Sequence, residues 1–416
     1  MRILYISGDL GVEAGGRKGA ATHIRATCDA LKAFGHEVLL VTPTIGDTSE
    51  IDFPVLEVKA ARSKMLGADG RYLLLNFRMK KVLEEAVIDF RPDAVYERYS
   101  LYQTAGEEIC RRRGLPRILE VNTLLAHEQS NRLRFPRFAQ WVEHRLWRRE
   151  KAIIAVSTML KRLMVDAAGL DIGAMTGFVI CPVAVNPARF SPATPPVDLN
   201  MLGAANREVV AYIGTLTAWH GVDLFFEGAR ILRDADRPTV IMAVGGEDDR
   251  VERLRLRARE EGVESHLLFL GSIPHSQVPA LLAAVDVCLI PDTQDWSSPT
   301  KFFEFAAMQK PVVAARAPAV EEVFGSSEQT GVLFERGNAR DMVRALESVL
   351  DDARLARRIG RASRRHIMEH YTWARAVQTI MRLYRDLGAK NAEEPPPEAH
   401  IDPVSPAYLG EDEPAP

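Results

Sequence analysis

The chain has 416 residues, more than one hydrophobic core normally supports, so the sequence predicts two domains of roughly 150 to 200 residues each. Its 47% hydrophobic and 26% charged residues exclude an intrinsically disordered protein, and its net charge of −3 provides no overall field for nucleic acid. We therefore expect a globular protein without a nucleic-acid partner.

The apolar segments and the cysteines favour a cytoplasmic protein. No stretch of about 18 uninterrupted apolar residues predicts a transmembrane helix, and the apolar run at residues 1–7 is too short for a signal peptide. The four cysteines lie far apart, without the paired spacing of metal ligands, as expected of buried thiols in a reducing compartment. Any contact with a membrane would be peripheral.

Short apolar, β-branched runs alternate with amphipathic stretches from the start of the chain, which is typical of βαβ units around a parallel sheet. A strand is predicted at 3–6, then a glycine-rich loop through Gly19, a helix at 22–34 and a strand at 37–42. Further strands of the first half are predicted at 93–96, 117–121, 152–156 and 178–181.

The basic and aromatic segment 127–150 has two interpretations. It is either an element that meets a membrane surface or an acceptor, or a helix that buries Phe138, Trp141 and Leu146 against the sheet. Base rates favour the second interpretation.

The proline-rich segment 191–196 predicts a linker, after which the pattern restarts. The second half is predicted to contain strands at 209–213, 239–244, 267–270, 287–290, 312–314 and 331–334, and helices at 222–234, 250–261, 341–350 and 372–387. From Ala389 onward proline and acidic residues dominate, which predicts a disordered tail.

Residues 295–314 are the most informative segment. Ser298 followed by Pro299 predicts a helix start capped by the serine, with the amides of Thr300 and Lys301 free to hold a phosphate. Glu304 lies one turn deeper, where a carboxylate can accept hydrogen bonds from ribose hydroxyls. The alternative, a solvated surface glutamate, fits poorly with the phenylalanines and alanines on both sides of it.

This segment resembles the retaining glycosyltransferase family 4, of GT-B fold, over about residues 1–388. The second glutamate of that family's Glu-x7-Glu pair falls at Glu304, whereas Trp296 stands at the position of the first, with Asp295 beside it. Gly19-Ala-Ala-Thr-His23 is similar to the family's glycine loop, and the segments 155–158 and 181–192 resemble further family landmarks.

The resemblance implies an α/β fold of two Rossmann-like, doubly wound parallel-sheet domains facing across a cleft. The implied domains are 1–195 on the acceptor side, 196–370 on the donor side, a helix at 371–388 crossing back to the first domain, and the tail at 389–416.

The resemblance also assigns site residues, several of them altered. Thr215 and His220 stand where the family carries an arginine and a lysine on the donor diphosphate, so we expect a protonated His220 and Lys301 to share that charge. The simpler interpretation of His220 is a helix-start residue without a ligand. The implied donor-binding set is Gly19, Ala20, Thr215, His220, Gly246, Ser272, Ile273, Ser298, Thr300, Lys301 and Glu304, although the turns at Gly246 and Ser272 could equally be ordinary turns.

At the end of the strand 117–121, Asn122 stands where the family usually places a histidine against the donor sugar. Asparagine cannot take a proton, so an acid or base role would shift to His127 or Glu128, or be unnecessary. The implied catalytic set is Asn122, His127, Glu128 and Lys301.

The implied reaction is transfer of a sugar from a nucleoside diphosphate sugar to an acceptor hydroxyl of a glycan, glycolipid or small molecule, with retention of configuration. We expect no cofactor and no metal, because the metal-dependent class of transferases, with its Asp-x-Asp motif, has a different fold. Two alternatives remain open: an enzyme resembling a sugar-nucleotide epimerase, and a non-catalytic scaffold that binds sugar nucleotides. The sequence leaves the sugar, the base, the acceptor and the oligomeric state open.

Overall fold

The computed structural model describes residues 1–16, 18–61, 64–325 and 330–393, so the predicted disordered tail lies outside the described residues from 394 onward. The chain forms two compact units. The first comprises Met1–Val183, Trp296–Ser298 and the described residues from Trp373 onward, and the second comprises Ala184–Asp295 and Pro299–Thr372. The sequence placed the first boundary at 195; the first unit ends earlier because Val185 already forms a β-bridge with Thr372 of the second unit.

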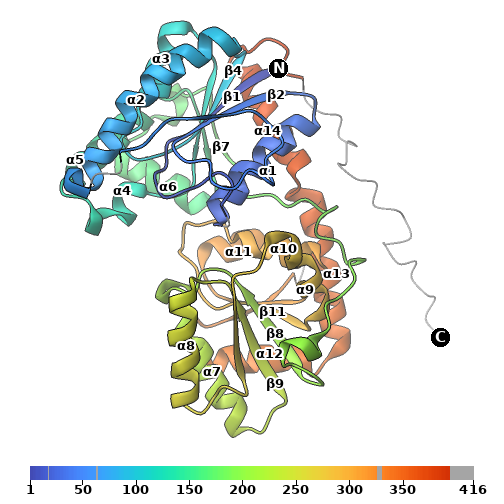
Figure 1. The fold of residues 1–416 in the computed structure, drawn as a ribbon. Coiled ribbons are helices and arrows are strands. Elements are labelled where there is room, and N and C mark those ends of the chain that lie inside the picture. Colours follow the sequence, from blue (N-terminus) through green and yellow to red (C-terminus); the bar gives the residue numbers. More distant parts are fainter. Residues whose placement is uncertain (17, 62–63, 326–329, 394–416) are drawn as a thin grey trace, which may run out of the picture. The chain divides into compact units, whose positions relative to one another are not determined.

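In the described part of the first unit, a seven-stranded parallel sheet has the order β3-β2-β1-β4-β5-β6-β7. Most of these strands are buried apolar runs, as expected of a parallel sheet with both faces covered (Figure 1). The strands are β1 (Arg2–Ser7), β2 (Glu37–Thr42), β3 (Val55–Glu57), β4 (Ala94–Arg98), β5 (Arg117–Val121), β6 (Ala152–Ala155) and β7 (Gly177–Ile180).

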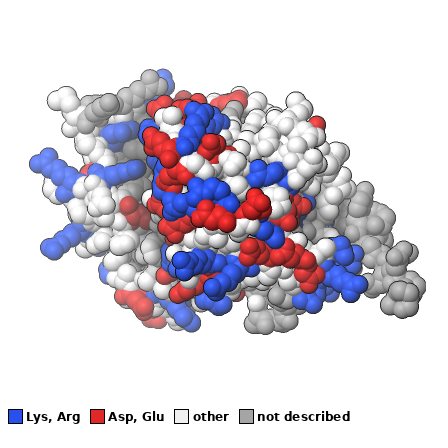
Figure 2. Space-filling model, turned by 90° about the horizontal axis from the view of Figure 1, so that it is seen from below, with Lys and Arg blue, Asp and Glu red and all other residues white. Residues whose placement is uncertain are grey.

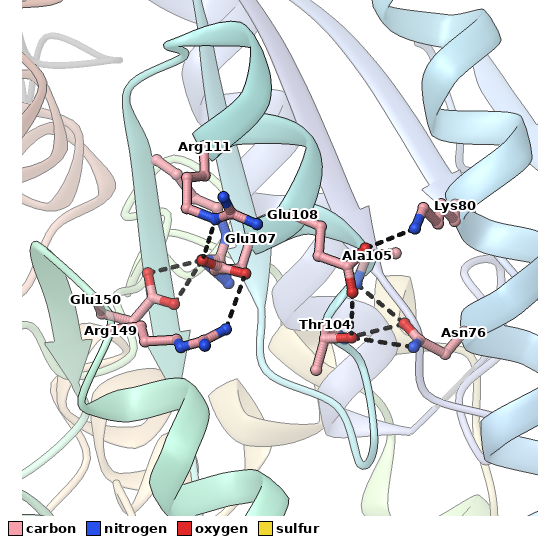
Figure 3. Close-up of polar contacts among 10 residues, drawn as sticks. Asn76, Lys80, Thr104, Ala105, Glu107, Glu108, Arg111, Arg149 and Glu150 are labelled. Carbon is pink, nitrogen blue, oxygen red and sulfur yellow. Dashed lines mark hydrogen bonds and ion pairs between the residues drawn. The ribbon is translucent and has the colours of Figure 1, made fainter.

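The helices of the first unit are α1 (Gly19–Ala33), α2 (Gly67–Phe90), α3 (Ala105–Arg113), α4 (Leu125–Glu128), α5 (Pro136–Trp147), α6 (Thr158–Ala168) and α14 (Trp373–Asp386). The last of these, α14, packs against α1 and β5. Side chains of α2 fix the start of α3: Asn76 Oδ1 accepts the amide hydrogens of Thr104 and Ala105 at 2.9 and 3.0 Å, and Lys80 pairs with Glu108 (Figure 3).

In the described part of the second unit, a six-stranded parallel sheet has the order β10-β9-β8-β11-β12-β13. Its strands are β8 (Glu208–Ile213), β9 (Thr239–Val244), β10 (Leu267–Gly271), β11 (Val287–Ile290), β12 (Val312–Ala315) and β13 (Val332–Phe334). Its helices are α7 (Val222–Asp234), α8 (Asp248–Glu260), α9 (Val278–Ala284), α10 (Thr300–Ala307), α11 (Pro318–Phe324), α12 (Ala339–Leu350) and α13 (Ala353–His370).

Short 3-10 turns complete both units. They are η1 (Lys64–Leu66), η2 (Ser130–Arg132), η3 (Ile172–Ala174), η4 (Leu199–Leu202), η5 (Ala218–His220) and η6 (His275–Gln277). No helix in the described ranges is both long and apolar enough to cross a membrane.

The predicted α/β class is confirmed, and most predicted strands lie within a residue or two of the observed ones. The single long element expected over 127–150 is wrong, because α4, η2 and α5 divide that region. The expected burial of Phe138 and Trp141 is also wrong: they are 46% and 53% exposed, whereas Leu146 is buried.

Candidate active site

The strand orders locate a ligand-binding edge in each unit. A doubly wound sheet binds ligands outside the carboxyl ends of its strands, where the strand order reverses. In the second unit that point lies between β8 and β11, and in the first between β1 and β4. Each edge is described separately below.

In the second unit, glycines allow the loops after β8 and β9 to approach each other closely. A Cβ on Gly245 would lie 2.2 Å from the carbonyl oxygen of Gly214, and Gly245 has a φ of 119°. Gly246 follows in the same loop, and its carbonyl accepts the Ser272 hydroxyl at 2.6 Å. Ser272 and Ile273 directly follow β10, so three adjacent strand ends hold these donor-binding candidates.

Lys301 lies at the centre of this edge. A Cβ on Gly214 would lie 2.8 Å from Lys301 Nζ, so the amino group occupies the space that the glycine leaves open. Nζ is 5.8 Å from the centre of the Tyr212 ring. Burial lowers the pKa of Lys301, and the nearby Glu304 carboxylate acts in the opposite direction.

His220 is neutral in this arrangement, in place of the expected cation. Its Nδ1 lies 3.0 Å from Thr215 Oγ1 and 2.8 Å from Thr217 Oγ1, and the side chain is buried. Burial, together with the Lys301 ammonium, lowers the pKa of His220 to about 3. As a neutral imidazole, His220 has one ring nitrogen that donates and one that accepts, and Nδ1 is the nitrogen that contacts both threonine hydroxyls.

The start of α10 differs from the prediction. Pro299, and not Ser298, is the N-cap residue, and no side chain caps the helix. The Ser298 hydroxyl instead accepts the amide hydrogen of Val183 at 3.2 Å, and both residues belong to the first unit. The amides of Thr300 and Lys301 remain uncapped at the helix start, as expected of a phosphate-binding end.

Glu304 has a partner that sequence reasoning missed. Its Oε1 lies 2.8 Å from His275 Nε2, and the two side chains are 14% and 20% exposed. Glu304 is thus a largely enclosed carboxylate, and not the solvated surface residue of the alternative interpretation. His275 follows Pro274 closely after β10, beside the candidate base-contacting residues, so its position alone could have drawn attention to it.

Asp295, next to the altered family position, forms an ion pair with Arg336. The guanidinium bonds Asp295 at 2.8 Å and Asp292 at 2.7 Å, and also donates to the Thr293 carbonyl. Asp295 therefore does not offer a bare carboxylate in place of the family's first glutamate.

One Asp-x-Asp triplet does occur in the sequence, at Asp234-Ala-Asp236. It lies at the end of α7, which begins after the carboxyl end of β8 and runs back toward the opposite edge of the sheet. Among the described residues, no group of three or more His, Cys, Asp or Glu side chains is arranged to hold a metal ion.

In the first unit, α1 begins at Gly19 with Ala20, and no side chain caps it. A Cβ on Gly19 would meet nothing within 4 Å, so this helix start opens into free space. The buried Arg25 supports the loop before it by donating to the carbonyls of Ala14 and Gly16 at 2.6 and 2.8 Å.

A buried carboxylate, Glu120, organises the carboxyl edge of this sheet. Its Oε1 accepts from Asn122 at 2.5 Å and Arg98 at 3.2 Å and lies 2.6 Å from His23 Nε2, while Oε2 accepts the Tyr96 hydroxyl at 2.6 Å. Burial raises the pKa of Glu120, but these partners outweigh it and lower the pKa to about 2. The Asn122 amide is thus committed to Glu120, and its carbonyl oxygen remains available.

His127 and Glu128 are exposed on the short helix α4. Thr123 links Glu128 to Trp296: the Trp296 indole donates to Thr123 Oγ1 at 3.0 Å, and the Thr123 hydroxyl donates to Glu128. The His127 ring meets the edge of Trp296 with 6.2 Å between ring centres. Asn122, His127 and Glu128 therefore lie on one short stretch of chain. Trp296 contacts His127 directly and is linked to Glu128 through Thr123.

Two family models match the chain. "Glycosyltransferase Family 4" matches residues 17–174, in the first unit, and "Glycosyl transferases group 1" matches residues 202–366, in the second. The chain is a family 4-like glycosyltransferase of GT-B fold.

Curated relatives of this family member match it to different extents. D-inositol 3-phosphate glycosyltransferase of Corynebacterium aurimucosum is 29% identical over 43% of this chain, and the match spans 43% of that relative, less than half its length. Glycogen synthase of Mycobacterium tuberculosis is 23% identical over 95% of this chain and 97% of its own.

Solved structures share the fold over nearly the whole chain. A glycosyltransferase from Rickettsia africae superposes with a TM-score of 0.74 at 16% identity, covering 94% of this chain and 99% of its own. HepE from Anabaena superposes with a TM-score of 0.71 at 18% identity, covering 92% and 99%.

Proposed function

We propose that this chain transfers a glycosyl group from a nucleoside diphosphate sugar to an acceptor hydroxyl, with retention of configuration and without a metal. The observation that carries the proposal is Lys301, whose amino group lies over Gly214 at the strand-order reversal of the second unit. Among the described residues it makes no ion pair within 4 Å, so it is available to an anionic ligand.

The donor diphosphate would be held by groups around that amine. The uncapped amides of Thr300 and Lys301 supply the partial positive charge of a helix start, and Lys301 supplies a full one. The neutral His220 would donate through Nε2 to a phosphate oxygen, in place of the family's fixed cation. These groups would stabilise the negative charge that grows on the leaving diphosphate.

Glu304 would hold the ribose through the oxygen that His275 does not engage, and backbone groups at Ser272 and Ile273 would meet the base. In the first unit, Gly19 and Ala20 are the proposed donor-binding residues, and Asn122, His127 and Glu128 are the proposed residues for orienting a sugar or an acceptor. Support for this class of donor comes from HepE, solved in complexes with UDP and glucose and with UDP-glucose.

The test is a transfer assay on the full chain. Candidate nucleotides are first ranked by thermal shift, since a ligand that binds only the folded state stabilises it in proportion to ln(1 + [L]/Kd). The best nucleotide is then supplied as its sugar derivatives with acceptors, and NMR reads the anomeric configuration of the product. Glycoside product with the donor's configuration, formed in EDTA, supports the proposal.

Three results would reject it. Epimerised sugar nucleotide without transfer would indicate an epimerase-like enzyme, and binding without turnover for any acceptor would indicate a scaffold. Activity lost in EDTA and restored by manganese would contradict metal independence. A cytoplasmic location, also part of this proposal, is checked by fractionation of cells.

A further inference from the structure

The surface of the segment around α5 has an unusual composition. From Arg132 to Arg149, every side chain with more than about a third of its surface exposed is an arginine or an aromatic. Together these are Arg132, Arg134, Phe135, Arg137, Phe138, Trp141, Arg145, Arg148 and Arg149. Phe135, Phe138 and Trp141 are 55%, 46% and 53% exposed.

Spacing gathers these side chains on one side of the helix. Phe138, Trp141 and Arg145 follow at steps of three and four residues. The rings of Phe138 and Trp141 stack with centres 5.8 Å apart, and the Arg145 guanidinium lies 5.4 Å from the centre of the Trp141 ring. Arg134 lies similarly over Phe135, at 5.5 Å.

The positive charge of this side is uncompensated. Both acidic residues between Arg132 and Glu150 point inward: Glu143 is 2% exposed, and Glu150 pairs with the buried Arg117. Within the described ranges, no carboxylate lies within 4 Å of the guanidinium group of Arg132, Arg134, Arg137 or Arg145. By contrast, basic and acidic side chains interleave on the face of the molecule drawn in Figure 2.

Helix α2 extends this surface with aliphatic and aromatic groups. Its Asp69 accepts the amide hydrogens of Arg134 and Phe135 at 2.7 and 3.3 Å, which fixes the start of the α5 segment beside α2 (Figure 1). Leu73 and Phe77 follow Asp69 at four-residue steps, on the same side of α2, and are 45% and 74% exposed. We call Arg134, Phe135, Arg137, Phe138, Trp141 and Arg145 with Leu73 and Phe77 the basic-aromatic face.

We propose that the basic-aromatic face binds the surface of a lipid bilayer that contains anionic lipids. Arginines attract anionic headgroups, and aromatic rings settle at the boundary between headgroups and acyl chains. The exposed Leu73, with Met65 at 97% just before α2, adds aliphatic surface that suits acyl chains better than nucleic-acid bases. The face lies on the outer sides of helices, and not along a sheet edge that would pair with a peptide strand.

The experiment is flotation of the full chain with vesicles of phosphatidylcholine alone or mixed with phosphatidylglycerol. Wild type should float with the anionic vesicles and not with the neutral ones, and added salt should weaken the binding. Phe138→Ser with Trp141→Ser, and separately Arg137→Glu with Arg145→Glu, should each reduce binding about tenfold or more.

Matched controls lie on exposed positions of the second unit: Leu256→Ser for lost apolar surface, and Arg253→Glu with Arg340→Glu for reversed charge. They should float like wild type. Melting temperatures verify that each variant is folded, and a variant that does not fold is replaced by Phe77→Ser. Equal flotation of face variants and wild type overturns the proposal. So does binding that single-stranded DNA competes away, because the face would then serve a nucleic acid.

Discussion

The indole nitrogen of Trp296 donates to Thr123 Oγ1 at 3.0 Å, and the Thr123 hydroxyl in turn donates a hydrogen bond to Glu128 Oε1. A tryptophan thus stands where the family has a carboxylate, and Thr123 links it by hydrogen bonds to the carboxylate of Glu128 on α4. Trp296 also packs on the core of β5, β6 and α6, which gives the ring a structural role as well.

Trp296→Phe keeps most of this packing and removes only the hydrogen bond. If Glu128 acts on the acceptor, kcat should fall several-fold while the donor KM stays unchanged, and stability should fall by about 0.5–1.5 kcal/mol. Steady-state kinetics and urea unfolding measure the two effects. A raised donor KM with an unchanged kcat would place Trp296 on the donor instead.

Glu120→Gln should destabilise the first unit by about 3–5 kcal/mol, because it removes the charge that buried partners require. Arg98 and His23 would lose an anion that is only 1% exposed. Urea unfolding measures the effect, and Glu128→Gln, an exposed change on the same edge, should stay within about 0.5 kcal/mol of wild type. A Glu120→Gln variant as stable as wild type would show that the stability of the first unit does not depend on an ionised carboxylate at this position.

The sequence predicted the sheets better than the site, for physical reasons. Strands such as β6 and β11 are short apolar runs between turns. This pattern is typical of strands in any parallel sheet that is covered on both faces, so it can be recognised from local sequence alone. Helix α2 was missed although Tyr72, Leu75, Met79 and Leu83 repeat at helical spacing and are buried. That signal was present in the sequence.

The partners of site residues were not predictable in this way. Glu120 contacts His23, which lies 97 residues away in the sequence, and Arg98, which lies 22 residues away. His275 and Glu304 are separated by 29 residues in the sequence. The charge of His220 depends on burial and on Lys301, neither of which a local motif reveals.

The pH dependence of His220 follows from its lowered pKa of about 3. Since the unfolded histidine titrates near 6.5, its contribution to stability is complete above that pH and is lost as pH falls toward 3, by about 1.4 kcal/mol per pH unit. His220→Gln should therefore lose less stability than wild type between pH 7 and pH 5 in urea unfolding. Parallel losses in the two proteins would mean that His220 titrates normally.

Donor binding should reflect the same neutral imidazole. His220→Ala should weaken nucleotide affinity by a similar factor from pH 6 to pH 8, because a neutral donor does not titrate there. Calorimetric titrations at several pH values measure this, and an effect confined to low pH would restore the cationic role expected from the sequence.

Glu304→Gln should weaken binding of the full nucleotide by about 1.5–3 kcal/mol, the range for hydrogen bonds to a charged group. His275→Gln is the matched variant: it removes the imidazole and leaves the carboxylate, so it should cost clearly less. Calorimetry with a ribonucleotide and its 2′,3′-dideoxy analogue isolates the ribose contact. If Glu304→Gln weakens both ligands equally, the carboxylate does not read the ribose.

The central claim is that Lys301 holds the diphosphate of a nucleotide donor, and calorimetric titration of Lys301→Met tests it most directly. UDP, GDP and ADP are titrated into wild type, and the tightest ligand is compared with its nucleoside, with Arg253→Met as the control for charge. The account predicts that Lys301→Met lowers the affinity for the nucleoside diphosphate by about 10- to 100-fold and leaves the affinity for the nucleoside unchanged. It also predicts that the control variant binds both ligands like wild type. Equal diphosphate affinity in Lys301→Met and wild type, or no binding of any of the three nucleotides by wild type, would contradict it.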